Sequence, residues 1–147
     1  MTIGLTTDQK GVIAETSVVR EAIRRGIGVS RPIGPEWYDL VFDLRPGPVR
    51  VQCKWASLRG DVIAVRVVSA RRTAGGLATR AYSAEEIDAF AAYCPELDAC
   101  FFLPIARFAQ TRAIQLRTGP CRNGQSVAVN WASEFAFDAT LPNHAGP

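Results

Sequence analysis

Histidine is nearly absent from this chain of 147 residues, and cysteine is sparse. The single histidine, His144, makes catalytic triads that need an imidazole base improbable. The four cysteines are Cys53, Cys94, Cys100 and Cys121. No two of them form a Cys-x-x-Cys pair, which argues against a structural zinc site, and we expect small buried thiols in a reducing compartment. Any catalysis must then depend on carboxylates, lysine or metal ions.

Long hydrophobic runs are also absent. Apolar segments such as 61–66 and 100–103 are far shorter than the roughly 20 residues needed to cross a bilayer. The first ten residues lack a positive segment followed by an apolar stretch, as a secretory signal would have. We therefore expect a cytoplasmic protein without a membrane partner. The length, the apolar content of 48% and the absence of repeats predict one domain over residues 1–147.

The net charge of +3 is unevenly distributed. Residues 45–80 carry eight basic residues and one acid, a net charge of +7, whereas the remainder of the chain carries −4. Fifteen of the seventeen basic residues are arginine, whose planar group binds phosphate at two points. A basic middle third is typical of a protein that binds a polyanion, because neutralised phosphates release counterions. The alternative is a solvated basic face without a partner.

The first predicted element is a helix over residues 8–25. Thr6, Thr7 and Asp8 offer side chains that cap a helix, and Gly26 offers a stop. Glu15 falls inside the apolar arc of this helix. Burial of an isolated carboxylate costs several kcal/mol, so Glu15 should have a cation, a hydrogen-bond donor or a metal beside it.

A β-hairpin is predicted next, from residues 38–44 and 49–55, because apolar and polar residues alternate in both segments. If a four-residue turn connects them, Asp39 lies opposite Lys54. Asp39, Gln52 and Lys54 then share one face of the hairpin. A slip of one residue would move one strand's polar residues to the other face, but both strands have one apolar face, which supports this register.

The rest of the chain predicts a mixture of strands and helices. A central strand is predicted over 61–69, followed by a mobile basic loop over 71–80. A helix over 84–93, with Asp88 in its early acidic turn, then crosses over to a buried strand at 100–103. A short helix is predicted over 131–137. The predicted fold class is therefore α/β in the broad sense, or α+β.

Four side chains of the predicted structure could act together in one reaction: Glu15, Asp39, Gln52 and Lys54. Two carboxylates and a carboxamide oxygen are the hard ligands that Mg²⁺ prefers. A neighbouring lysine can orient or deprotonate an attacking water, or neutralise charge on a phosphate. The set indicates phosphodiester hydrolysis. The alternatives are a structural ion pair of Asp39 with Lys54, a core pairing of Glu15 with an arginine, and an amide of Gln52 that only satisfies the backbone.

The pattern of Glu15, Tyr38-Asp39 and Gln52-Cys53-Lys54 resembles the PD-(D/E)xK nuclease superfamily. It is similar to the small members with glutamine in place of the usual acid, such as group I intron homing endonucleases, and the likeness extends over most of the chain. The resemblance implies a restriction-endonuclease-like core, in which an N-terminal helix precedes a mixed central sheet with flanking helices. It also implies that Asp39 binds metal, that Glu15 completes or supports the site and that Lys54 is catalytic. The chain departs from the pattern at Tyr38, which replaces proline, and at Gln52, whose neutral amide lowers the expected metal affinity.

We therefore expect a Mg²⁺-dependent endonuclease that hydrolyses double-stranded DNA, with Mn²⁺ as a substitute ion. Glu15, Asp39 and Gln52 are the predicted metal residues, and Lys54 positions the water. Cutting both strands takes two sites, so we expect a homodimer or homotetramer. Predicted phosphate contacts are Arg71, Arg72, Arg80, Arg107, Arg112, Arg117 and Arg122. The alternatives are a catalytically inactive nucleic-acid-binding module with the same fold and an oligomeric scaffold that binds no nucleic acid.

Overall fold

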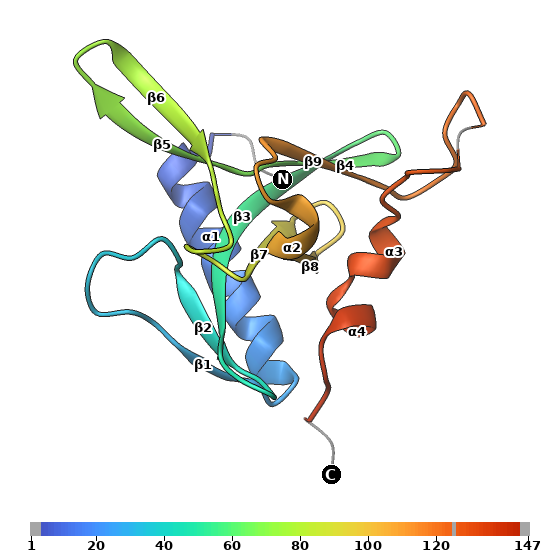
Figure 1. Cartoon of the computed structure of the whole chain (residues 1–147). Coiled ribbons are helices and arrows are strands. Elements are labelled where there is room, and N and C mark those ends of the chain that lie inside the picture. Colours follow the sequence, from blue (N-terminus) through green and yellow to red (C-terminus); the bar gives the residue numbers. More distant parts are fainter. Residues whose placement is uncertain (1–3, 125, 145–147) are drawn as a thin grey trace.

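The computed structural model describes residues 4–124 and 126–144, in which helices and strands are mixed (Figure 1). In chain order the elements are α1 (Thr7–Arg24), β1 (Gly28–Ser30), β2 (Leu40–Asp43), β3 (Val49–Arg59), β4 (Val62–Arg66), β5 (Val68–Thr73), β6 (Gly76–Ala81), β7 (Ala89–Cys94), β8 (Ala99–Pro104), α2 (Ile105–Phe108), β9 (Ala113–Arg117), α3 (Ala132–Phe135) and α4 (Phe137–Thr140). The predicted fold class, an N-terminal helix followed by a mixed sheet, is confirmed.

Helix α1 begins with a capping box. The side chain of Thr6 accepts a hydrogen bond from the Gln9 N–H at 3.1 Å, and the side chain of Gln9 accepts one from the Thr6 N–H at 2.9 Å. Gly26, with a φ of 75°, follows the helix in the conformation that glycine adopts most easily. The helix buries Ala14, Val18 and Ala22, and it packs against β3 and β7. Its predicted bounds are correct to within one residue at each end.

Strand β3 organises the sheet. The strand order is β1-β2-β3-β4-β9, and β7 pairs with β3 in parallel and with β8 antiparallel. Residues 49–51 of β3 pair with β2, residues 51–55 with β7, and residues 56–59 with β4. A single long strand therefore connects the part of the sheet that α1 covers to the part that contains β4 and β9 (Figure 1).

The β2–β3 register differs from the prediction by two residues. Leu40 is paired with Val51 and Phe42 with Val49, so the four-residue turn and the opposition of Asp39 to Lys54 were wrong. Six residues, 43–48, lie outside the β2–β3 ladder, and the two prolines among them have no N–H to donate. A shift of two residues leaves every side chain on its predicted face, because side chains alternate with a period of two.

The predicted strand over 61–69 is divided, and the predicted mobile loop over 71–80 is wrong. The chain leaves β4 at Val67 and forms a two-stranded ribbon, β5–β6, which extends away from the rest of the molecule (Figure 1). Thr73 is paired with Gly76, so only two residues make the turn. The Thr73 hydroxyl donates to the Gly76 carbonyl oxygen at 2.8 Å. Gly76 has a φ of 114°, which a residue with a side chain rarely adopts.

The helix predicted over 84–93 is also wrong. The capping residues form a single turn, in which the Ser83 N–H donates to Oε1 of Glu86 at 2.9 Å, and the chain then enters β7. An apolar run buried on both sides is compatible with either a helix or a strand, and here parallel pairing with β3 selects the strand. The buried strand predicted over 100–103 is confirmed as part of β8. A turn over 95–98, not a helical crossover, connects it to β7.

The remaining predictions concern the C-terminal part and the cysteines. The short helix predicted over 131–137 is two short helices, α3 and α4, with a break at Ala136. All four cysteines are free thiols; Cys53, Cys94 and Cys100 are buried, as predicted, and Cys121 is half-buried. Among the described residues, no helix has the length and hydrophobicity required to span a membrane.

Candidate active site

The four predicted site residues come from three segments that lie side by side. Glu15 is in the middle of α1, Asp39 comes directly before β2, and Gln52 and Lys54 are two residues apart on β3. Oδ2 of Asp39 accepts a hydrogen bond from the Cys53 N–H at 3.0 Å, which ties this carboxylate to β3. The Asp39 N–H donates to the Val51 carbonyl oxygen at 2.9 Å. The backbone therefore fixes Asp39 beside Gln52.

The amide of Gln52 lies between acceptors on one side and a hydroxyl on the other. One end of the amide is 2.9 Å from the carbonyl oxygen of Trp37 and 3.2 Å from Oδ2 of Asp39, and the other end is 3.3 Å from the hydroxyl of Tyr82. Hydrogen bonding assigns nitrogen to the first end, because two acceptors face it, and oxygen to the second. Gln52 thus connects Asp39 to Tyr82.

Lys54 is half-buried on the same face. Its Nζ donates to the carbonyl oxygen of Val68 at 3.0 Å and lies 5.1 Å from the centre of the Tyr82 ring. Burial lowers the pKa of Lys54, and the charge of Asp39 partly offsets this effect. No ion pair between Asp39 and Lys54 is formed among the described residues, so the alternative of a structural cross-strand pair is not what the geometry shows.

The electrostatics bring Glu15 into the same group. Burial raises the pKa of Asp39; the Cys53 hydrogen bond lowers it, Glu15 raises it, and Lys54 and Arg31 lower it. Glu15 is 3.6 Å from Arg31, which meets the expectation that this carboxylate needs a partner. Arg31 is exposed, so the pair is not a core ion pair. The structure therefore brings Asp39, Gln52 and Lys54 together, and Glu15 acts on Asp39 through its charge.

Sequence reasoning missed two contributors to this site: the carbonyl oxygen of Trp37 and the Tyr82 side chain. A main-chain oxygen leaves no signal in a sequence. Tyr82 follows β6 and is 4% exposed, packed edge-on against Phe90 at 5.4 Å. A tyrosine next to a turn gives no indication of the strand face that it will reach.

The arginines predicted to contact DNA fall into two groups. Arg71 and Arg72 are exposed on the β5–β6 ribbon, and their side chains have no ion-pair or hydrogen-bond partner in the part of the chain that the structure describes. Arg80 is bound within the protein: its guanidinium pairs with Glu86 at 2.6 Å and stacks 4.2 Å from the Trp37 ring. Arg112, directly before β9, donates to the Thr79 hydroxyl at 3.0 Å.

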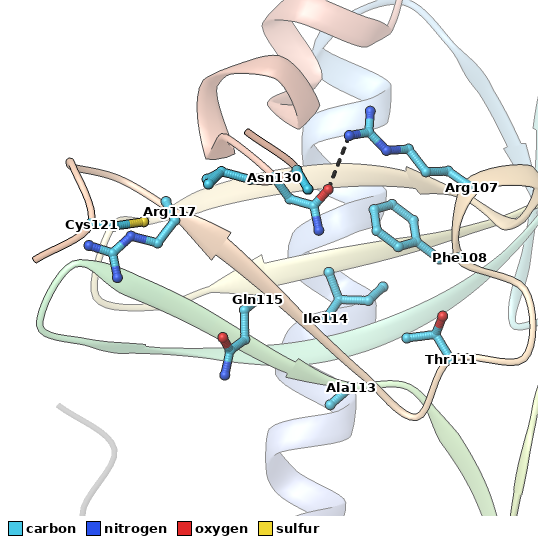
Figure 2. A pocket seen from close by; sticks show the side chains of 11 residues that line it. Arg107, Phe108, Thr111, Ala113, Ile114, Gln115, Arg117, Cys121 and Asn130 are labelled. Carbon is cyan, nitrogen blue, oxygen red and sulfur yellow. Dashed lines mark hydrogen bonds between the residues drawn. The ribbon is translucent and has the colours of Figure 1, made fainter. Parts of the chain in front are cut away.

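The second group surrounds a pocket of about 570 Å³ between α2, β9 and the segment 121–130. Figure 2 shows Arg107 and Arg117 toward opposite ends of it. Arg107 donates to Oδ1 of Asn130 at 3.1 Å, and Arg117 donates to the carbonyl oxygens of Gly119 and Pro120. Arg122 is exposed nearby. This pocket has none of the four site residues in its lining.

The donors at the site suit a hard cation. Within residues 4–124 and 126–144 there is no group of three or more histidine, cysteine, aspartate or glutamate side chains that could hold a metal. Asp39 and Glu15 provide two carboxylates, and the main-chain carbonyl oxygen of Trp37 lies 2.9 Å from the Gln52 amide, whose own oxygen becomes a further ligand when it faces Asp39. Oxygen-only donor sets of this kind fit Mg²⁺. The residues present therefore fit a divalent metal if neutral oxygens complete the set.

A helix packed on a mixed sheet, with an acid ahead of one strand and Gln-x-Lys on the next, places this chain in the nuclease class. The model of the PD-(D/E)XK endonuclease family matches residues 5–138, and the chain belongs to this family. Among solved structures it is similar to the bacterial homing endonuclease I-Ssp6803I, with a TM-score of 0.73 and 25% identity over 91% of this chain and 90% of that one. No curated protein matches. The predicted resemblance and nuclease function are confirmed.

Proposed function

We propose that this nuclease is a Mg²⁺-dependent endonuclease that hydrolyses phosphodiester bonds in double-stranded DNA, as a homing-type enzyme of one domain. The observation that carries the proposal is the convergence of Asp39, Gln52 and Lys54 on one face of adjacent strands, with Glu15 beside them. Mn²⁺ is expected to substitute for Mg²⁺, since both take oxygen ligands.

Glu15, Asp39 and Gln52 would hold the metal. A bound divalent ion supplies Lewis acidity that polarises a phosphoryl oxygen. The carboxylate of Asp39 keeps its orientation through the Cys53 N–H, and Arg31 offsets the repulsion between Glu15 and Asp39. Because Gln52 contributes no charge, the site has one negative charge fewer than a site with three carboxylates.

Lys54 would position the attacking water and neutralise charge on the phosphate. The Val68 carbonyl accepts one N–H of the ammonium group, so its other donors can reach a water or a phosphate oxygen. Burial lowers the pKa of Lys54, which makes its proton easier to lose than that of an exposed lysine. Both roles, positioning the water and neutralising charge on the phosphate, require the amine of Lys54 at this point on β3.

The β5–β6 ribbon is the proposed path of the DNA backbone. It begins at Val68, which binds Lys54, and continues to Arg71 and Arg72 on its exposed part. A pocket of about 560 Å³ lies between the ribbon and Trp37, whose carbonyl oxygen contacts Gln52. We assign phosphate contact to Arg71, Arg72 and the exposed Arg122. The other four predicted arginines, Arg80, Arg107, Arg112 and Arg117, already bind groups of the protein and would shape the surface.

One copy of the chain offers one such site. Cleavage of both strands needs two sites, so we propose a homodimer or homotetramer in solution. A light-scattering mass measurement at several protein concentrations checks this. The expected mass is two or four times the 16.0 kDa of one chain; a mass of one chain at every concentration, together with double-strand cutting, would contradict the proposal.

Cleavage of supercoiled plasmid DNA tests the function. Lys54→Met keeps the apolar stem of the side chain and removes the amine, and we expect it to lower the cutting rate at least about a hundredfold. Lys10→Met is the matched control, because Lys10 is the other lysine of the chain and lies over the ring of Trp55, whose side chain is on the other face of β3 from Lys54. The control should cut at the parental rate.

Two further measurements keep the result interpretable. Circular dichroism shows whether Lys54→Met is folded, and a gel-shift assay without Mg²⁺ shows whether it still binds DNA. A folded Lys54→Met that cuts as fast as the parent would refute the role of Lys54. A parent chain that binds DNA but does not cut it, whichever divalent ion is added, would instead identify a binding module.

A further inference from the structure

We propose that the amide of Gln52 turns over when a divalent cation binds, and that the main-chain carbonyl oxygen of Trp37 is a ligand of this cation together with Oδ2 of Asp39 and Oε1 of Gln52. The inference rests on the proposed function, because it concerns the same metal site. It assigns one more ligand, and it assigns Tyr82 as a positioning residue that holds the amide in both orientations.

The spacing of three atoms carries the inference. One end of the Gln52 amide is 2.9 Å from the Trp37 carbonyl oxygen and 3.2 Å from Oδ2 of Asp39. In an octahedral Mg²⁺ site with bonds of about 2.0–2.1 Å, neighbouring ligands are about 2.9 Å apart. If the amide nitrogen occupies that end, it donates to both oxygens. If the amide oxygen occupies it, three oxygens converge, and a cation between them compensates for their repulsion.

Tyr82 makes both orientations possible. Its hydroxyl is 3.3 Å from the other end of the amide. A phenol donates and accepts, so it can donate to the amide oxygen in one orientation and accept from the amide nitrogen in the other. Tyr82 is 4% exposed and packed against Phe90, so its hydroxyl stays in place while the amide turns.

The carbonyl of Trp37 is held toward the site from both sides. The Trp37 ring stacks on Arg80, 4.2 Å away, and Glu86 holds that guanidinium at 2.6 Å. Two residues later, the Asp39 N–H is bonded to the Val51 carbonyl of β3. A neutral main-chain oxygen is also what the site needs, because its carboxylates alone do not make a metal cluster among the described residues.

Nuclear magnetic resonance without DNA tests the inference directly. Trp37 is the only tryptophan followed by tyrosine, so labelling tryptophan carbonyls with ¹³C and tyrosine nitrogens with ¹⁵N gives one correlation, which reports the Trp37 carbonyl. Glutamine side chains labelled with ¹⁵N report the Gln52 amide, identified by its loss in Gln52→Glu. On titration with Mg²⁺ we expect both signals to move along one saturable curve. The amide of Gln115, exposed on β9, should not move.

Two variants separate the role of Tyr82 from a general loss of packing. Tyr82→Phe should change the Gln52 amide signal both before and after Mg²⁺ is added. Tyr93→Phe removes a comparable hydroxyl, which donates to Asp98 at 2.9 Å, and should leave the Gln52 signal unchanged. Equal effects of the two variants, or no effect of Tyr82→Phe, would overturn the role of Tyr82.

Calorimetry of Mg²⁺ binding adds a second readout. Gln52→Glu should tighten binding about tenfold, since it adds a charge and removes the need to turn the amide. Gln115→Glu adds the same charge elsewhere and should leave the affinity unchanged. If the Cys53 N–H signal follows Mg²⁺ but the Trp37 carbonyl and the Gln52 amide do not, the inference fails and the metal site stands. If no signal responds at saturating Mg²⁺, the proposed metal site fails as well.

Discussion

Three hydrogen bonds connect Arg50 and Asp88, a charged pair near the site. Nε and Nη2 of Arg50 donate to the two carboxylate oxygens at 3.0 and 3.1 Å, and the Arg50 N–H donates to Oδ2 at 2.8 Å. The remaining guanidinium donors reach the carbonyls of Ala84 and Glu85. Asp88, predicted for the first turn of a helix, instead fastens the start of β7 to β3. The pair therefore aligns the two strands directly beside Gln52.

This pair predicts a dependence of stability on pH. The hydrogen bond from Arg50 holds the pKa of Asp88 below its usual value. The stabilisation is fully present above the pKa of the unfolded chain, about 3.9, and is lost as the pH falls through the lower pKa of the folded chain. We expect Asp88→Asn to lower the free energy of unfolding by about 1 kcal/mol at pH 7, a value reduced because the pair is partly exposed, and by less at pH 3.

Urea denaturation at both pH values measures the difference. Asp43→Asn is the control, because Asp43 pairs with Arg45 at 3.0 Å where both side chains are largely exposed, and such pairs contribute little. An effect of Asp88→Asn that is equally large at pH 3 and pH 7 would show that the carboxylate charge is not what stabilises the strand pairing.

At the scale of elements, the β5–β6 ribbon depends on its two-residue turn. The ribbon is mostly exposed and pairs with no other strand in the described chain, so little tertiary packing supports it. Gly76 and Gly75 both have open space where a Cβ would lie, but only Gly76 has a positive φ, 114°. We expect Gly76→Ala to strain this turn and open the ribbon, whereas Gly75→Ala should be tolerated.

Hydrogen exchange measures this opening locally. Amides of β5 and β6 should exchange about tenfold faster in Gly76→Ala, since a strained φ costs about 1–3 kcal/mol. Amides of β3 and β7 should keep their protection, because the ribbon is not part of that sheet. If Gly75→Ala and Gly76→Ala accelerate exchange equally, the turn conformation is not the cause.

At the scale of the whole molecule, the location of the unpaired arginines determines which surface can bind the DNA backbone. Arg71 and Arg72 are exposed on β5, and Arg45 is in the turn between β2 and β3. Figure 1 shows the β5–β6 ribbon and this turn at opposite ends of the molecule. If the ribbon contacts phosphates, replacing Arg71 and Arg72 together by alanine should reduce the slope of log affinity against log salt by about 2. Gel shifts at several salt concentrations give this slope.

Arg45→Ala is the control, because its side chain is 84% exposed and already pairs with Asp43. It should leave the slope unchanged. A double variant with the parental slope would show that the DNA backbone follows another surface, and the exposed Arg122 beside the pocket of Figure 2 would then be the next candidate.

The sequence determined those features whose signals are local. Thr6 and Gln9 cap α1 through side chains that bond within one turn, so this helix could be placed to within a residue. Gln52 and Lys54 share a face because any extended strand repeats every two residues, and a register error of two left that conclusion intact. The acid, amide and amine of the site could therefore be found before the structure.

Only the tertiary structure decided the rest. The run over 89–94 is compatible with a helix or a strand until β3 and β8 provide partners for its backbone on both sides. The Trp37 carbonyl and the Tyr82 hydroxyl reach Gln52 from segments whose paths depend on distant packing. Local sequence specifies hydrogen bonds and periodicity over a few residues, whereas the burial that positions distant groups depends on the complete arrangement of the sheet.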